Sequence, residues 1–494
     1  MSVLPCILGL DVSTTASKAV CINSEGTVLA QASNEHQLSS PYPLWSEQDP
    51  ENWWYAMCKS IRSILLSVDV KAVRAIGLTG QMHGLVLLDS HGKVLRPAML
   101  WNDGRAGKQC EMIRERVGLK HLVATTGNDA FTGFTAPKLL WVHDHEPKCY
   151  AKIAQVLLPK DYIRWKLSGT YATDRAGAGG TLLLDLSTRT WAVDVLRDLE
   201  IPEAWLPPTH EGTEATGIVD RTGALETGLL EGIPVYAGGG DQAAQAVGVG
   251  AIQPDTWAVT LGTSGVVFAP SKDPRTEPLG RAHAFPHAIP ETWHMMGVML
   301  SAAGSFQWYR DTLASHISFE QLLEEAAEVE PGSEGLFFSP YLSGERTPHA
   351  DPLVRGSFIG LTSRHTRGHL TRAVLEGVAY GLRDNLQLLH DAGLPAPERI
   401  RISGGGAKST LWRQILSDIM RHPLSVVEVT EGAAMGAALL AGNGVGIWDS
   451  VQAACDSTIS VHEQSFPGDA ERVYASLHEQ FKELYPRLKG FYST

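Results

Sequence analysis

Two stretches of the chain, one near its start and one just past its middle, share an order of residue types: an apolar run, a small polar turn and a second apolar run. In the first stretch, Pro5–Leu10 and Lys18–Ile22 flank the polar segment Asp11–Ser17. In the second, Thr256–Phe268 is interrupted by the turn Gly262–Gly265. Short apolar runs on either side of a turn predict β-hairpins. One such hairpin in each half indicates a weak internal duplication.

The chain is long enough for more than one hydrophobic core, since it has 494 residues, of which 44% are hydrophobic. Its 49 glycines and 19% charged residues fit a turn-rich α/β enzyme better than a disordered or coiled-coil chain. Apolar strands separated by amphipathic segments such as Trp53–Val68 predict sheets covered by helices on their faces. We therefore predict an α/β fold of two similar domains, residues 1–246 and 247–494.

Charge and composition argue against several kinds of partner. The net charge of −13, without a long basic run, argues against sequence-independent binding of nucleic acid. The first apolar run follows no basic segment and is interrupted by Asp11, and no run of about 20 apolar residues occurs. We therefore expect neither a signal peptide nor a membrane span. Six cysteines without a Cys-x-x-Cys pair favour free thiols in the cytoplasm. The sequence leaves a homodimer open.

The two turns could approach a phosphate. Asp11 stands at a predicted strand end ahead of Ser13, Thr14 and Thr15, where its carboxylate could hold Mg²⁺ through water. The turn Gly262–Gly265 is of the same kind. Either turn alone is also explained as an ordinary hairpin turn, because such turns favour Asp, Ser and Thr. Together, one in each half, they indicate a nucleotide clamped between two similar domains.

A third glycine-rich segment, Ser403–Ser409, follows the predicted strand Arg399–Ile402 and precedes a predicted helix that begins at Thr410. Glycines there allow close approach of a ligand, and a helix N-terminus favours anions. The spacing around Lys408 matches neither a Walker A loop nor the dinucleotide pattern G-x-G-x-x-G. A tight connection from strand to helix is the alternative.

The segment Gly238–Asp241 places an acidic residue after a glycine-rich strand end and before a helix. A carboxylate in such a concave position can accept the proton of an attacking hydroxyl. An N-cap aspartate is the simpler alternative, but a cap needs no preceding run of glycines. We therefore predict that Asp241 is functional.

Two further loops have residues suited to a polyol. His83 lies in a predicted turn between the strands Ala75–Leu78 and Leu85–Leu88, and Trp101–Arg105 places an aromatic ring beside Asn, Asp and Arg. A structural histidine and a surface turn are the alternatives. His143-Asp144-His145 is predicted to be a solvated loop, because histidines two residues apart do not share a helix face.

With these segments in order, the chain resembles the FGGY carbohydrate kinases over nearly its whole length. The most specific part is Gly356–Leu361, followed by His369-Leu370 and then Ala373–Glu376, which is similar to the family's C-terminal signature. The resemblance implies two actin-like (ribonuclease H-like) ATPase domains flanking a central cleft. The N-terminal domain would bind the sugar and carry the catalytic Asp, and the C-terminal domain would bind the nucleotide.

The resemblance also implies roles for individual residues. Asp241 would be the catalytic base, and the sugar contacts would be Met82, His83, Trp101, Asp103, Asp241 and Gln242. ATP would be bound by Thr14, Thr15, Lys18, Gly262, Thr263, Gly304, Gln307, Gly405, Gly406 and Ser409. Mg²⁺ would be held by Asp11.

Within the family, Gln81–Gly84 and Leu100–Asp103 are similar to the xylulose kinase pattern, so we expect ATP-dependent phosphorylation of D-xylulose to D-xylulose 5-phosphate. The chain departs from that pattern at Gln242, where Asn is expected. Ribulose, glycerol, gluconate or another polyol stays open as the substrate. Chaperone ATPases and filament proteins, which share the fold, are the alternatives outside metabolism, and the Asp241 segment and polyol-type loops argue against them.

Overall fold

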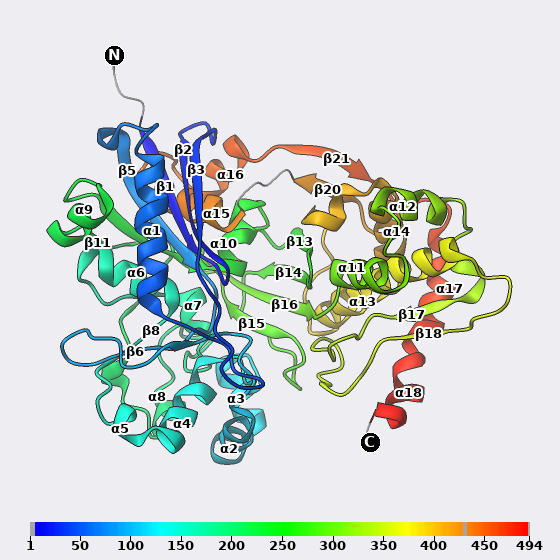
Figure 1. The fold of residues 1–494 in the computed structure, drawn as a ribbon, viewed down its shortest axis with the longest axis horizontal. Helices are drawn as coiled ribbons and strands as arrows, with labels where there is room; N and C mark the ends of the chain where they lie inside the picture. The colour runs from blue at the N-terminus through cyan, green and yellow to red at the C-terminus, as the bar shows by residue number, and fades with distance from the viewer. Residues whose placement is uncertain (1–4, 428–431, 493–494) are drawn as a thin grey trace.

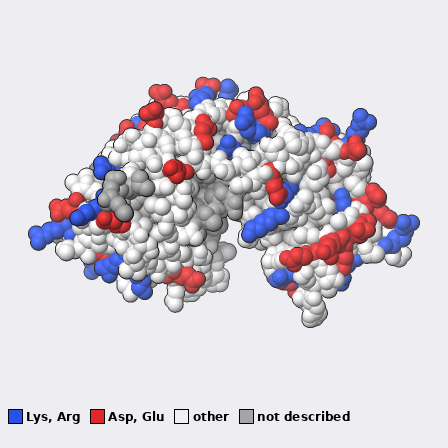
Figure 2. Space-filling view, turned by 90° about the horizontal axis from the view of Figure 1, so that it is seen from above, with Lys and Arg blue, Asp and Glu red and all other residues white. Residues whose placement is uncertain are grey.

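The computed structural model describes residues 5–427 and 432–492. Two lobes lie side by side, each built around one large mixed sheet (Figure 1). The surface is hollowed between the lobes, and acidic and basic side chains are interspersed over the face seen in Figure 2. In the described part of the chain, no helix combines the length and apolar character that a bilayer crossing requires.

The sheet of the N-terminal lobe has the strand order β11-β12-β5-β1-β2-β3. Its first three strands in sequence form an antiparallel meander, β5 and β12 run parallel to β1, and β11 lies antiparallel at the edge. The bounds are β1 Cys6–Val12, β2 Ala16–Asn23, β3 Val28–Glu35, β5 Val73–Gly80, β11 Ala215–Ile218 and β12 Pro234–Gly240.

The sheet of the C-terminal lobe repeats this plan in the order β15-β16-β14-β13-β19-β20-β21. The antiparallel run β13-β14-β16 corresponds to β1-β2-β3, and β19 and β20 run parallel to β13. The predicted duplication and the predicted actin-like two-domain fold are confirmed. The bounds are β13 Thr256–Leu261, β14 Gly265–Ser271, β15 His283–Pro286, β16 Trp293–Met299, β19 Arg399–Ser403, β20 Leu424–Val427 and β21 Val461–Ser465.

The first hairpin differs in one respect from the prediction. Asp11 and Val12 still pair with Lys18 and Ser17 across the hairpin, so Asp11 lies inside β1 and the turn is reduced to residues 13–15. The prediction of a turn over Asp11–Ser17 is wrong, because cross-strand pairing extends both strands into polar residues. In the second hairpin, β13 ends at Leu261 as predicted and β14 begins earlier, at Gly265.

Helices cover both faces of the N-terminal sheet, and the alternation along β1 shows why. Leu8 points into the cluster that contains Trp53 of α1, whereas Ile7 points into the cluster that contains Leu439 of α15. Successive side chains of a strand face opposite sides, so a strand that is apolar throughout needs cover on both. The helices are α1 Pro50–Ile64 and α15 Gly432–Gly444, on opposite faces of the sheet in Figure 1.

Helix α10, Asp241–Gly248, joins the lobes. Ala243 and Val247 pack with α15 and the N-terminal sheet, whereas Ala246 belongs to the cluster of Phe268 on the C-terminal sheet. The boundary predicted between residues 246 and 247 falls inside this helix and stays a prediction.

The remaining elements surround these layers. The other helices are α2 Gly107–Val117, α3 Leu119–Thr126, α4 Thr135–His145, α5 Pro147–Tyr150, α6 Pro159–Ser168, α7 Arg175–Gly179, α8 Val193–Asp198, α9 Arg221–Thr227, α11 Ala303–Leu313, α12 Phe319–Ala327, α13 Arg367–Asp391, α14 Thr410–Met420, α16 Val451–Thr458, α17 Glu471–Lys482 and α18 Leu484–Tyr492. Short strand pairs are β4 Glu47–Gln48 with β7 Ala98–Met99, β6 Val86–Leu88 with β8 Gln155–Leu157, β9 Thr173–Asp174 with β10 Thr209–His210, and β17 Phe337–Ser339 with β18 Ser357–Ile359.

The contact between α10 and α15 yields a stability test. A Cβ added at Gly436 of α15 would lie 1.8 Å from the carbonyl oxygen of Ala244. We expect Gly436→Ala to lower the free energy of unfolding by about 2 kcal/mol or more through overpacking. The matched control is Gly490→Ala in α18, where nothing lies within 4 Å of the added Cβ; helix propensity predicts a gain of about 0.5–1 kcal/mol there. Equal denaturation midpoints for the two variants would contradict this account.

Candidate active site

Asp241 is the first residue of α10, directly after the glycines that end β12. Those glycines are required by close packing. Gly238 has φ 68°, and a Cβ there would lie 1.7 Å from the carbonyl oxygen of Leu78 on β5. A Cβ on Gly240 would lie 2.9 Å from Cγ of Met82. Gly240, and not Asp241, occupies the N-cap position of the helix. The cap alternative is therefore wrong.

The half-buried carboxyl of Asp241 has an altered acidity. Burial raises its pKa to about 6, while hydrogen bonds from the backbone N–H and the side chain of Gln242 act in the opposite direction. A carboxylate of this pKa is ionised at neutral pH and basic enough to accept a proton from a hydroxyl that is losing it in a reaction. Gln242, the residue that departs from the expected Asn, is thus a direct neighbour of the candidate base.

Met82 and His83 belong to a loop that packs against the residue before Asp241. Met82 is buried against Gly240, and His83 has φ 69° with its Nδ1 2.6 Å from the carbonyl oxygen of Gly180. The ring of His83 meets that of Phe134 edge-on, with centroids 4.7 Å apart. Burial lowers the pKa of His83 to about 3, so the ring is neutral at pH 7. Because Nδ1–H donates to Gly180, Nε2 carries a lone pair that can accept a hydroxyl proton.

Trp101 connects the sugar loops to the first hairpin turn. Its side chain is 40% exposed, and Nε1–H donates to Oγ1 of Thr14 at 2.9 Å. Thr14 Oγ1 in turn lies 3.3 Å from Oε1 of Gln81, the residue before Met82. The predicted phosphate turn and both predicted sugar loops therefore meet at one place.

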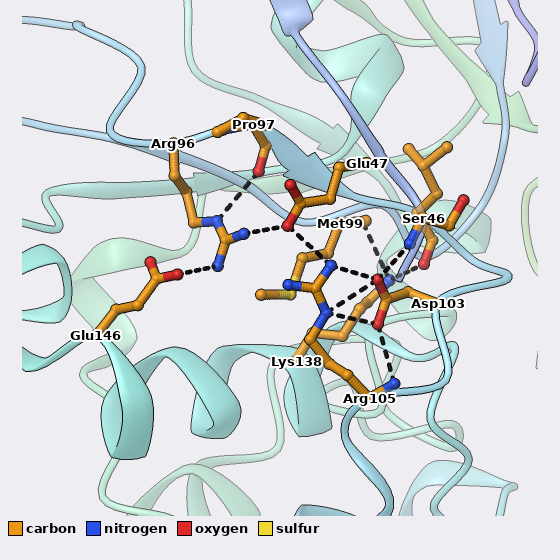
Figure 3. A network of polar contacts seen from close by, with 10 residues as sticks. Ser46, Glu47, Arg96, Pro97, Met99, Asp103, Arg105, Lys138 and Glu146 are labelled. Atoms are coloured by element: carbon orange, nitrogen blue, oxygen red, sulfur yellow. Dashed lines mark hydrogen bonds and ion pairs between the residues drawn. The ribbon is translucent and has the colours of Figure 1, made fainter. Parts of the chain in front are cut away.

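Asp103 is buried and already saturated with donors (Figure 3). Its Oδ2 accepts the backbone N–H of Ser46 at 2.8 Å and Nη2 of Arg105 at 2.6 Å, and its Oδ1 accepts Nε of Arg105 at 2.9 Å. Arg105 also pairs with Glu47 at 2.8 Å and lies over the ring of Trp45. These contacts fix the loop that carries Trp101. A direct bond from Asp103 to a sugar stays a prediction.

Sequence reasoning missed Lys138 of α4, which is fully buried and lies close to Met99 and Asp103 (Figure 3). Its Nζ donates to the carbonyl oxygens of His83, Leu100 and Met99, at 2.9, 2.8 and 3.2 Å. A signal was present in the sequence, because Lys138 is the one charged residue from Phe134 to Val142, where only Thr135 is otherwise polar.

The predicted nucleotide segments meet at the end of β13. The backbone N–H of Gly304, in the first turn of α11, lies 3.1 Å from the carbonyl oxygen of Thr263, and Gly262 accepts the N–H of Ala303 at 2.8 Å. Gly404, with φ 99°, passes so close to Leu261 that a Cβ would lie 2.6 Å from its carbonyl oxygen. The structure thus brings residues 262–265, 303–304 and 404–406 together.

Within this group, Gly405 and Gly406 differ. A Cβ on Gly405 would meet nothing within 4 Å, so its backbone faces open space, whereas a Cβ on Gly406 would lie 2.5 Å from Leu261. Ser409 caps α14, since its Oγ accepts the N–H of Trp412 at 3.2 Å. Gln307 is exposed on α11 and donates to Asp311 at 2.6 Å. For Ser409 and Gln307, a contact with ATP stays a prediction.

The remaining residues that were predicted to bind ATP or Mg²⁺ lie on the first hairpin, and their contacts stay predictions. Thr15 is exposed in the turn, and Lys18 on β2 stands opposite the buried Asp11 in the strand register. Over the described residues, no group of three or more His, Cys, Asp or Glu side chains is arranged to hold a metal ion. A single carboxylate beside a predicted phosphate turn would suit Mg²⁺, which usually takes one or two protein carboxylates and completes its shell with phosphates and water.

The segment His143-Asp144-His145 forms the end of α4 rather than a loop, so that part of the prediction is wrong. Its exposure is as predicted. Helix α4 continues to His145 because the ring of His145 stacks on that of Trp141, one turn earlier, with the ring centroids 4.5 Å apart.

Comparisons with known proteins agree with this geometry. Residues 6–248 match the N-terminal domain, and residues 257–444 the C-terminal domain, of the FGGY family of carbohydrate kinases. Xylulose kinase of Escherichia coli is 41% identical, over 97% of this chain and 99% of that protein. Gluconokinase of Bacillus subtilis is 30% identical, over 99% of this chain and 97% of that protein. The crystal structure of xylulose kinase from Rhodospirillum rubrum, 33% identical, superimposes with a TM-score of 0.93 over 99% of this chain and 100% of that one.

The environment of His83 yields a test that needs no ligand. Since burial lowers its pKa to about 3, the ring should show no titration between pH 5 and 8. Nitrogen and carbon shifts of labelled histidine, assigned with His83→Asn, should report one neutral Nδ1–H tautomer throughout. A midpoint for His83 inside this range would contradict the assignment of Nε2 as an acceptor.

Proposed function

The chain belongs to the FGGY family of carbohydrate kinases, and from this we propose that it transfers the γ-phosphoryl group of ATP to D-xylulose, giving D-xylulose 5-phosphate and ADP. The observation that carries the proposal is the position of Asp241. Its carboxyl, with a pKa near 6, lies at the end of β12 beside the Met82–His83 loop, and α10 leads from it toward the strand that ends in the nucleotide segments.

Asp241 acts as the general base. As the terminal hydroxyl of the sugar attacks the γ-phosphorus, its proton passes to the Asp241 carboxylate. A bond forms between that sugar oxygen and phosphorus, and the bond from phosphorus to the β,γ-bridging oxygen breaks, which releases ADP. The amide of Gln242 holds the carboxylate through its hydrogen bond.

The sugar loops bind the linear ketose. Nε2 of the neutral His83 accepts a hydroxyl, and the exposed indole of Trp101 offers an apolar wall. Asp103 supports that wall through Arg105 and Ser46. Similarity to xylulose kinases over nearly the whole chain supports D-xylulose as the acceptor.

The hairpin turns bind the phosphates. Backbone N–H groups around Thr14, Thr263 and Gly405 donate to phosphate oxygens, which suits an acidic protein that binds a polyanion by local dipoles. Asp11 would help to hold Mg²⁺, which neutralises charge on the phosphates when bound.

A second candidate acceptor is a sugar acid such as gluconate, and one observation favours it. Arg346 of the C-terminal lobe places its guanidinium over Phe131, 5.6 Å from the ring centroid, and 3.4 Å from His283. The carboxylate of the adjacent Glu345 accepts hydrogen bonds from the backbone N–H groups of Leu300 and Arg346 rather than from the Arg346 guanidinium group. This cation near the sugar loops, which the sequence did not reveal, could pair with a carboxylate.

A substrate panel tests the proposal. We expect ADP release to depend on added sugar, with kcat/KM for D-xylulose exceeding that for glycerol by at least about tenfold, because glycerol leaves polar groups of the site unpaired. D-Ribulose and gluconate complete the panel. Preference for gluconate would reject D-xylulose while leaving sugar phosphorylation intact. ATP turnover that no sugar or polyol stimulates would reject the kinase proposal itself.

The role of Asp241 is tested by Asp241→Asn, which should lower kcat by about a hundredfold or more with the KM for ATP unchanged. In the wild type, kcat/KM should fall about tenfold per pH unit below about 6, since the base must be unprotonated. Asp220→Asn at the N-cap of α9 is the control, because asparagine caps equally well.

The same variant has a stability signature. The pKa of Asp241 is higher in the folded protein than the usual 3.8, so its ionisation destabilises the fold as pH rises from about 4 to 6 and the loss persists above that range. Asp241→Asn should therefore keep or raise Tm at pH 7. A lowered Tm would contradict the raised pKa of Asp241, whereas nearly normal turnover would remove Asp241 from the mechanism.

A further inference from the structure

Lys138 has an environment unlike that of an ordinary lysine. Its side chain is fully buried on α4, and Nζ contacts the carbonyl oxygens of His83, Leu100 and Met99 at 2.8–3.2 Å rather than a carboxylate. Burial of an ammonium group is costly unless every N–H is paired. Here three N–H donors meet three acceptors, so the charge is compensated by backbone dipoles.

The three carbonyls belong to the two sugar loops. One is that of His83 itself, whose φ of 69° is rarely adopted by a residue with a side chain. Another is that of Leu100, whose peptide bond leads into Trp101. The loops are separate in sequence, and the ammonium group of Lys138 bonds to both, in addition to the direct bond from the N–H of Leu85 to the carbonyl oxygen of Met99.

We propose that Lys138 is a positioning residue for the sugar acceptor: its ammonium group fixes the loop of His83 and the loop of Trp101 at the spacing that a linear polyol chain requires. This inference rests on the proposed function. It concerns the acceptor only, because the nucleotide segments at Thr263 and Gly405 belong to the other lobe and have no contact with Lys138 among the hydrogen bonds of Nζ.

The charge state of Lys138 matters to this role. A neutral amine has two N–H donors and would lose one of the three hydrogen bonds from Nζ that tie the two loops to α4. Burial lowers the pKa of Lys138 to about 7, with the charge of Asp103 acting against the shift and that of Arg105 adding to it. Glu47 faces the same group through its ion pair with Arg105. The folded pKa lies below the ordinary 10.5, so the fixed arrangement is lost as pH rises above about 7.

The test uses Lys138→Met, with Thr135→Val as the matched control. Oγ1 of Thr135 donates to the same carbonyl of His83 at 2.9 Å, so the control removes one donor to one loop and leaves the link between loops intact. We expect Lys138→Met to raise the KM for the sugar at least tenfold while the KM for ATP stays within twofold, and Thr135→Val to change the sugar KM less than threefold. In the wild type, the sugar KM should rise above pH 7.

A purely structural role gives another result. It would lower Tm and reduce kcat through loss of active protein, with the KM for the sugar unchanged and no dependence of that KM on pH between 6 and 9. An unchanged sugar KM in Lys138→Met, or a wild-type sugar KM that does not depend on pH, would each overturn the proposal.

Lys138→Arg keeps a permanent charge with several donors and should remove the alkaline rise in the sugar KM. If Lys138→Met does not fold, Lys138→Gln, with two N–H donors, takes its place.

A measurement without substrate separates this inference from the proposed function. Hydrogen exchange should rise together in residues 82–88 and 98–105 of Lys138→Met, including the amide of Leu85, which donates to Met99 at 2.9 Å. Exchange in the first hairpin, residues 6–23, should stay as in the wild type. Unchanged exchange in both sugar loops would overturn the role of Lys138, whichever sugar the enzyme uses. Failure of D-xylulose alone in the panel would overturn only the choice of acceptor.

Discussion

Contact between backbones, without side chains in between, holds helix α15 against the N-terminal lobe. A Cβ added at Gly9 of β1 or at Gly77 of β5 would lie 1.9 Å from a carbonyl oxygen of α15, and one added at Gly436 would lie 1.8 Å from a carbonyl oxygen of α10. A helix this close to a sheet and to a second helix has little freedom to shift, because no flexible side chain can absorb the movement. The place of α10, and hence of the first residue of α10, follows from these glycines.

The acidity of Asp241 is a consequence of that place. The residue begins a helix that is buried between the two lobes, so the protein removes water from around its carboxyl. The hydrogen bonds that replace this water come from the backbone N–H and the side chain of Gln242. Desolvation without a full set of donors favours the protonated form and raises the pKa. Functional sites commonly retain such an unfavourable charge because the chemistry needs it. Here the same burial that weakens the fold makes the carboxylate a better base.

The features that the sequence predicted depend on contacts between residues close in the chain, whereas the features that it missed depend on residues further apart. The hairpin at Gly262 depends on neighbours within a few residues, and it was predicted. The end of β1 depends on pairing of Asp11 with Lys18, and it was not. Lys138 reaches carbonyls about 40 to 55 residues earlier in the chain, and such contacts leave no local pattern except a charge within an apolar helix.

The shared helix α10 also explains why acceptor choice and phosphate binding can be set by different parts of the molecule. Its eight residues span about 12 Å at 1.5 Å per residue. Asp241 stands at one end, and one turn later Gln245 donates to Thr260 of β13 at 3.1 Å, two residues before Gly262. The proposed base and the proposed nucleotide turn are thus held by one short rigid element and vary little relative to each other. The loops of His83 and Trp101 are attached elsewhere, to α4 through Lys138. Substitution of Lys138 therefore acts first on these two loops, and it reaches the first hairpin turn only through the bond from Trp101 to Thr14.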